Sequence, residues 1–354
     1  MSASASAVPF GQTPAVRVGP DAWEWLNAAD RSGRVGGRFR GGVNVVFGSE
    51  ALVCLQSPEI PIHPWALVAN LPWEEVAEGA PVTVSRGELS VGHTVLPLVE
   101  AEVVDLTFHP PEDLVSLEEL RERVALTERL LAETSDPFES EFDRTFVRDR
   151  DRILAQWQET SNPEVLLDLI GRGPGTTPAG DDTLIGLLAG LEVLAAVSPL
   201  ATGPSPQATR YWPARTFFYK PRATMLHAAP VPPTSLLSAQ LLESAAAARF
   251  SQSLLSLQRS LAEPEATRAE VSRDARSSLS SGHTTGRSAL LGLVAPLSSR
   301  ELECTGKGLR VMHERETPLH SNTGSNCMAW GRDAGTREPP LRHDATHGTG
   351  TSNI

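Results

Sequence analysis

Two patterns of apolar positions divide the chain, and the change between them falls near residue 109. From residue 33 to about 108, apolar and polar positions alternate, as at Val43, Val45 and Phe47. Short apolar runs flank turns such as Arg86-Gly87-Glu88, and prolines break the middle of this stretch into loops. The pattern predicts a β-rich unit of residues 33–108, built as a small barrel or a sandwich of short strands.

Helical spacing replaces this alternation from residue 115 to 297. Leu120, Val124 and Leu131 form one apolar stripe behind Ser116, which together with Glu119 predicts a capping box. The remaining helices are predicted at about 142–157, after Asn162-Pro163, and at 182–197, 235–249, 251–262, 266–279 and 286–294. We therefore expect an α+β protein in which the β-rich unit is followed by a helical domain.

Three stretches show neither the alternating nor the helical spacing of apolar residues. Residues 1–32 are expected to be a partly disordered lead-in, and residues 198–233 an irregular, proline-rich excursion with an aromatic cluster. Residues 301–354 show no apolar periodicity, so we expect a disordered tail that the fold does not need.

Composition narrows the class of protein. Of 354 residues, 43 are acidic and 31 are Lys or Arg, which gives a formal net charge of −12 and argues against nucleic-acid or membrane-surface partners. The strongest apolar run, Leu184–Val197, is shorter than the ~20 residues of a spanning helix, and the chain start shows no signal peptide. Three cysteines without paired spacing favour a reducing compartment. We expect a cytoplasmic protein.

The first candidate site is the segment Gly171–Asp182, which runs from one helix end into the next helix start. Its glycines allow positive φ and a close backbone approach to a carboxylate or phosphate at the helix N-terminus. Asp181 and Asp182 would repel such an anion, so they either cap the helix or act on a water, an amide or a magnesium ion. A plain helix–loop–helix corner is the alternative. The candidate ligand-binding residues of this loop are Arg172, Gly173, Gly175, Thr177 and Gly180.

The second candidate site is Ser281-Gly282-His283-Thr284-Thr285-Gly286-Arg287, at the start of a later helix. His283 could be a general base or a structural tie between loops, and Arg287 could hold an anion or a surface glutamate. Thr284 and Thr285 add hydroxyls for binding.

Glycines in both following helices predict that the two helices touch. Gly186 and Gly190 lie one turn apart, and Gly292 is expected to meet that face. The two segments would then form one small-anion site with Asp181, Asp182 and His283 as catalytic candidates.

These two segments resemble the AllH-like family, which includes a subunit of oxamate carbamoyltransferase. The resemblance extends from about Gly33 to about Leu297, and the chain departs from the family at Ala179, where a serine is usual. The resemblance implies carbamoyl transfer between oxalurate and phosphate, giving oxamate and carbamoyl phosphate. It also implies two companions, an FdrA-type subunit similar to acyl-CoA synthetases and a second large subunit. No dedicated cofactor motif is visible.

The resemblance does not assign the chemistry to one subunit, so two other hypotheses stay open. The chain could be a non-catalytic scaffold or partner subunit of such a complex. It could also be a stand-alone protein that binds a small carboxylate or phosphate. The aromatic cluster at 211–219 weakly favours contact with a partner.

Overall fold

The structure is a computed structural model that describes residues 16–134, 140–160, 162–197, 234–282 and 284–298. The predicted excursion at 198–233, the predicted tail at 301–354 and residues 1–15 of the lead-in lie outside these residues, so those expectations stay predictions. None of the described helices is both long and apolar enough to cross a membrane.

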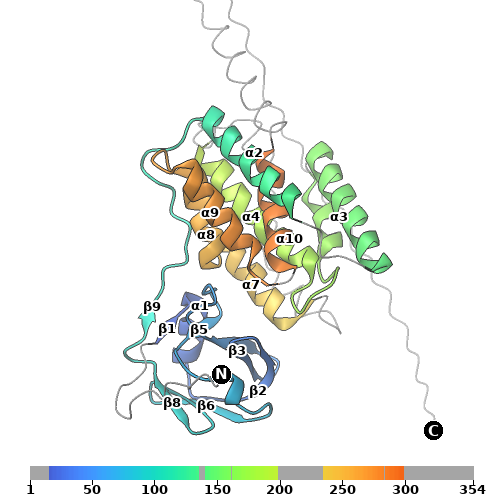
Figure 1. The fold of residues 1–354 in the computed structure, drawn as a ribbon. Coiled ribbons are helices and arrows are strands. Elements are labelled where there is room, and N and C mark those ends of the chain that lie inside the picture. The colour runs from blue at the N-terminus through green and yellow to red at the C-terminus, as the bar shows by residue number, and fades with distance from the viewer. Residues whose placement is uncertain (1–15, 135–139, 161, 198–233, 283, 299–354) are drawn as a thin grey trace, which may run out of the picture. The chain divides into compact units, whose positions relative to one another are not determined.

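Nine strands in the described residues form one sheet with the order β8-β7-β6-β2-β3-β4-β5-β1-β9, and the sheet curls into a half-barrel (Figure 1). Neighbouring strands are antiparallel except for the pairs β4–β5 and β1–β9, which are parallel. The strands are β1 (Arg17–Val18), β2 (Arg31–Phe39), β3 (Gly42–Phe47), β4 (Ala51–Gln56), β5 (Ala66–Val68), β6 (Pro81–Ser85), β7 (Glu88–Val91), β8 (Thr94–Pro97) and β9 (Glu102–Val103).

The alternating pattern explains the sheet core. Val43, Val45 and Phe47 are buried on one side of β3, as the alternation predicts. The turn between β6 and β7 places Arg86 at φ 54° and Gly87 at φ 77°, the left-handed values that a tight two-residue hairpin needs. The sheet begins before residue 33, because β1 and helix α1 (Pro20–Asn27) are already ordered within the expected lead-in.

The helical region follows the sheet, so the predicted α+β class is confirmed (Figure 1). Its helices are α2 (Leu117–Glu133), α3 (Glu141–Thr160), α4 (Ala179–Val197), α7 (Leu236–Ala246), α8 (Gln252–Ala262), α9 (Arg268–Leu279) and α10 (Thr285–Val294). Short 3₁₀ helices lie at η1 (Trp73–Glu75), η2 (Pro163–Leu169) and η4 (Ala295–Leu297). The helix predicted after Asn162 is therefore a 3₁₀ helix, although Asn162 Oδ1 caps it by accepting from the Glu164 N–H.

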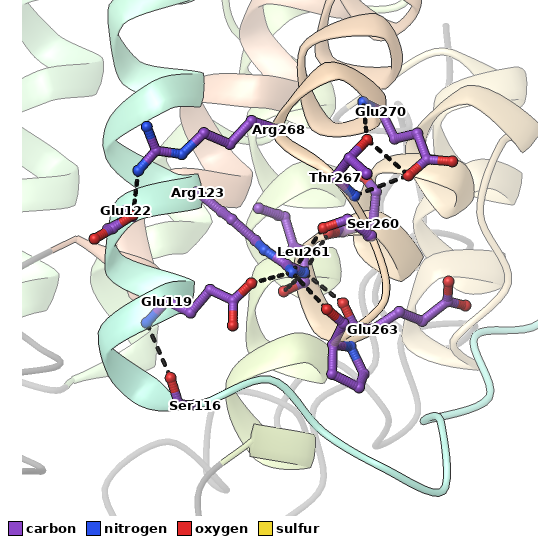
Figure 2. Close-up of polar contacts among 12 residues, drawn as sticks. Ser116, Glu119, Glu122, Arg123, Ser260, Leu261, Glu263, Thr267, Arg268 and Glu270 are labelled. Carbon is purple, nitrogen blue, oxygen red and sulfur yellow. Dashed lines mark hydrogen bonds and ion pairs between the residues drawn. The ribbon is translucent and has the colours of Figure 1, made fainter.

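The predicted capping box at Ser116 is half formed. Ser116 Oγ accepts from the Glu119 N–H at 3.2 Å, but the Glu119 carboxylate accepts from Arg123 instead of from the Ser116 backbone (Figure 2). Arg123 is 3% exposed and its guanidinium also donates to the carbonyls that end α8 and lead into α9. These carbonyls belong to Ser260, Leu261, Glu263, Pro264 and Ala266. The buried guanidinium of Arg123 thus takes the place of a helix C-cap. It also binds the Glu119 carboxylate, which would otherwise complete the capping box.

Helices α4 and α10 pack backbone against backbone. A Cβ atom added at Gly186 would lie 1.8 Å from the Ala289 carbonyl oxygen, and one at Gly190 would lie 2.2 Å from that of Leu293. Added at Gly292, it would lie 1.9 Å from the Thr183 carbonyl oxygen. The predicted close contact is therefore present. Since the contacts advance in the same direction along both helices, the two helices run parallel and begin together.

Candidate functional site

Asp181 holds the glycine-rich loop closed. Its Oδ1 accepts from the Gly171 N–H at 2.9 Å, and its Oδ2 accepts from the hydroxyl of Thr234, just before α7. The side chain is fully buried. Asp181 therefore joins three segments and does not cap its own helix, although a cap was one of the two expectations for it.

Asp182 joins the two candidate segments. Its Oδ2 accepts from Thr177 Oγ1 at 3.2 Å, and Thr285 also hydrogen-bonds to this carboxyl group. The two threonine hydroxyls lie 3.1 Å apart. The structure thus brings Thr177, Asp182 and Thr285 together where the parallel helices α4 and α10 begin.

The environment of Asp182 favours its neutral form. Only 1% of the residue is exposed, and this burial raises the pKa of its carboxyl group well above the usual range. The hydrogen bonds from Thr285 and Thr177 act in the opposite direction, while the neighbouring Asp181 raises the pKa further. A carboxyl group that keeps its proton can donate as well as accept, so it can exchange a proton with the two hydroxyls.

The loop glycines have different reasons for lacking a side chain. Gly173 (φ 93°) and Gly175 (φ 115°) have positive φ, and a Cβ at either would meet the Phe146 ring or the Thr284 hydroxyl within 3.1 Å. Gly180 lies inside α4, where a Cβ would be 2.0 Å from the Leu169 carbonyl oxygen. Gly173 and Gly175 therefore have the positive φ that the sequence predicts, whereas Gly180 allows the close packing of α4.

The two candidate arginines both contact other groups of the protein. Arg172 is half exposed and lies 3.4 Å from an oxygen of Asp149 on α3. Arg287 Nη1 donates to the carbonyl oxygens of Leu131 and Thr134 at the end of α2, at 2.7 and 2.9 Å. Arg287 therefore binds the negative end of a helix, which is a position that cations prefer.

His283 lies outside the described residues, so its predicted distance to Asp181 or Asp182 stays a prediction. Within the residues that the structure does describe, no three His, Cys, Asp or Glu side chains are grouped to hold a metal ion. The magnesium ion named above as one alternative for Asp181 and Asp182 stays a prediction.

Three residues near the site escaped the sequence-based prediction. Thr234 stands next to Ser235, which caps α7, and it was not among the candidate site residues. Phe146 on α3 packs on Ala179. Arg150 follows one turn later at 2% exposure; its Nη1 atom has no hydrogen-bond partner in the described chain. Spacing gave no signal for Phe146 or Arg150, because tertiary packing alone brings α3 to this loop.

The fold and this geometry define an α+β protein whose two glycine-rich helix starts share one buried carboxyl group. Residues 169–297 match the family model described as oxamate carbamoyltransferase subunit AllH, so this segment is similar to that family. The match includes both candidate segments, while the resemblance expected for residues 33–168 lies outside it. No curated protein and no solved structure matches the chain.

Proposed function

We propose that this chain is a subunit of an oxamate carbamoyltransferase-like complex and that Thr177, Asp182 and Thr285 contribute to its active site. The single observation that carries this proposal is the family match over residues 169–297, which spans both helix starts. Similarity to a subunit family associates the chain with this activity and with partner subunits. The FdrA-type and second large companions are the finer part of the proposal.

The proposed reaction forms one bond and breaks another at the carbamoyl carbon of oxalurate. A phosphate oxygen attacks the carbamoyl carbon of oxalurate, a tetrahedral intermediate forms, and the carbon–nitrogen bond then breaks. The products are carbamoyl phosphate and oxamate, whose nitrogen must take up a proton. Such a step needs a proton donor near the leaving nitrogen and donors for the developing negative charge.

Asp182 is suited to supply that proton through a hydroxyl rather than directly. The carboxyl group is buried, whereas Thr177 and Thr285 are partly exposed and both hydrogen-bond to it. We therefore assign Thr177 and Thr285 to substrate contact and Asp182 to holding and moving the proton behind them. His283 stays a candidate base.

The glycine-rich loop and the two helix starts would bind the anionic part of the substrate. The parallel start of α4 and α10 places two positive helix ends at the same point, which favours a carboxylate or phosphate. In the described chain, Gly175 and Thr176 donate no backbone hydrogen bond to another protein group. Their N–H groups are free to cradle an oxygen, as in anion-binding nests.

The test is the turnover of the complex reconstituted with its companion subunits. Asp182→Asn keeps the shape but removes the exchangeable carboxyl proton, so carbamoyl phosphate formation from oxalurate and phosphate should fall at least about 100-fold, within the range of general acid–base catalysis. Asp168→Asn is the matched control, because Asp168 is exposed on η2 and its side chain is outside the site. Co-purification of the companions should be unchanged in both variants. Full turnover with Asp182→Asn would favour the scaffold hypothesis.

A further inference from the structure

Asp182, Thr177 and Thr285 form a closed ring of hydrogen-bonding groups. The Thr177 hydroxyl donates to Asp182 Oδ2 at 3.2 Å, Thr285 also hydrogen-bonds to this carboxyl group, and the two hydroxyl oxygens lie 3.1 Å apart. Asp182 is 1% exposed, whereas both threonines are partly exposed. Of the three groups, the two hydroxyls are therefore the ones that a ligand meets, and their remaining hydrogen-bonding capacity decides what they bind.

The ring has no donor left for a ligand. A neutral carboxyl group carries one proton and each hydroxyl carries one, so the three groups supply one proton for each of their three mutual contacts. When Asp182 is ionised, both hydroxyls donate to its carboxylate instead. In either state every proton lies within the ring. Each hydroxyl oxygen has two lone pairs and uses at most one of them inside the ring, so both threonines keep the capacity to accept.

We propose that Thr177 and Thr285 select a nitrogen of the substrate, because their hydroxyl oxygens accept hydrogen bonds from its N–H groups. This role rests on the proposed function, in which the N–H groups of Gly175 and Thr176 cradle an oxygen of the substrate anion. Gly175, Thr176 and Thr177 are consecutive, so the anionic group and the nitrogen that they bind lie close together. A small acid with an amide on the neighbouring carbon, such as oxamate, has this arrangement. A ligand oxygen in place of the nitrogen would face lone pairs, and it could be bound only by breaking one of the ring's hydrogen bonds.

The same contact places the nitrogen where the proposed reaction needs a proton. The nitrogen of oxalurate only donates, since its lone pair is delocalised into the carbonyl groups. In the tetrahedral intermediate this nitrogen gains a lone pair and becomes an acceptor. One threonine hydroxyl then donates to it and takes the proton of Asp182, while the electron pair of the breaking carbon–nitrogen bond stays on nitrogen. The nitrogen leaves as the NH₂ group of oxamate, and the proton that the attacking phosphate loses returns Asp182 to its neutral form.

The experiment is a calorimetric titration of the full chain with oxamate and with pyruvate, in which a methyl group replaces the NH₂ group. Both probes carry one carboxylate, so the charges around the site act on them equally. The chain should bind oxamate about tenfold or more tightly than pyruvate. Thr285→Val keeps the shape but removes one acceptor, so this preference should fall below about threefold, whereas Thr285→Ser keeps the hydroxyl and should keep the preference.

Two further variants keep the result decisive. Thr177→Val removes the other acceptor from a different segment, so it should reduce the preference in the same way even if Thr285→Val does not fold. Thr83→Val is the control, because Thr83 is exposed on β6 and outside the ring, and it should bind both probes like the unchanged chain.

The inference is overturned if oxamate does not saturate, if pyruvate binds equally well, or if the folded valine variants keep the preference. Binding and turnover separate this inference from the proposed function. A chain that prefers oxamate but forms no carbamoyl phosphate in the reconstituted complex supports the nitrogen contact and contradicts the proposed reaction. Turnover by a chain without the preference contradicts the nitrogen contact alone.

Discussion

Gly292→Ala should destabilise the chain, although the same change usually stabilises a helix. The added Cβ would lie 1.9 Å from the Thr183 carbonyl oxygen and 2.8 Å from the Leu187 nitrogen. Ordinary contact begins at 3.4 Å, so α4 and α10 would have to separate by about 1.5 Å at this point. The atoms in the way belong to a helix backbone, which cannot rotate aside as a side chain can.

The expected size follows from two opposing effects. Overpacking costs about 1–3 kcal/mol, and the rigid backbone neighbour argues for the upper end. The better helix propensity of alanine returns up to about 1 kcal/mol. We therefore expect the free energy of unfolding to fall by about 2 kcal/mol, which corresponds to a drop in Tm of about 4–8 °C in a domain of this size class.

The assay is thermal and urea unfolding of Gly292→Ala beside Gly37→Ala. A Cβ at Gly37 would meet nothing within 4 Å, so this control should stay within about 0.5 kcal/mol of the unchanged chain. The same separation would stretch the 3.1 Å contact between Thr177 and Thr285, so turnover of the complex should fall as well. A Gly292→Ala chain that is as stable as the original, or more stable, would refute the close packing of α4 and α10.

Further predictions concern buried polar groups. Arg123→Met should lower the free energy of unfolding, measured by urea unfolding, by about 3–5 kcal/mol, because it leaves buried carbonyls and Glu119 without their cation. The control Arg268→Met removes an exposed ion pair and should lower the free energy of unfolding by less than about 1 kcal/mol. Burial lowers the pKa of His63 to about 4, so the folded chain should lose stability as the pH falls from about 6.5 towards 4, and His63→Asn should flatten this dependence. The raised pKa of Asp182 acts in the opposite sense: stability should fall as the pH rises above about 4, and Asp182→Asn should remove that loss. Burial raises the pKa of the Cys54 thiol to about 12, so peptide mapping should find it unlabelled by thiol reagents until the chain unfolds.

Local rules in the sequence determined where the elements begin and turn. Helix caps and tight turns act on backbone groups a few residues away, as at Ser116, Asn162 and the Arg86-Gly87 turn. A short stretch of sequence is therefore enough to predict them. The change from alternating to helical periodicity likewise predicted the α+β class, since it depends only on which face of each element is buried. The glycines at 186, 190 and 292 predicted that two helices touch, because a backbone approach demands the absence of a side chain.

Tertiary structure alone decided what the charged side chains do. Asp181 binds Gly171 and Thr234, Arg287 binds the end of α2, and Arg123 takes Glu119 from the expected capping box. Long polar side chains satisfy whichever buried group packing brings within reach, and most of these groups lie tens to hundreds of residues away along the chain. The parallel pairs β4–β5 and β1–β9 were hidden for the same reason, because the sequence shows which segments are strands but not which strands become neighbours.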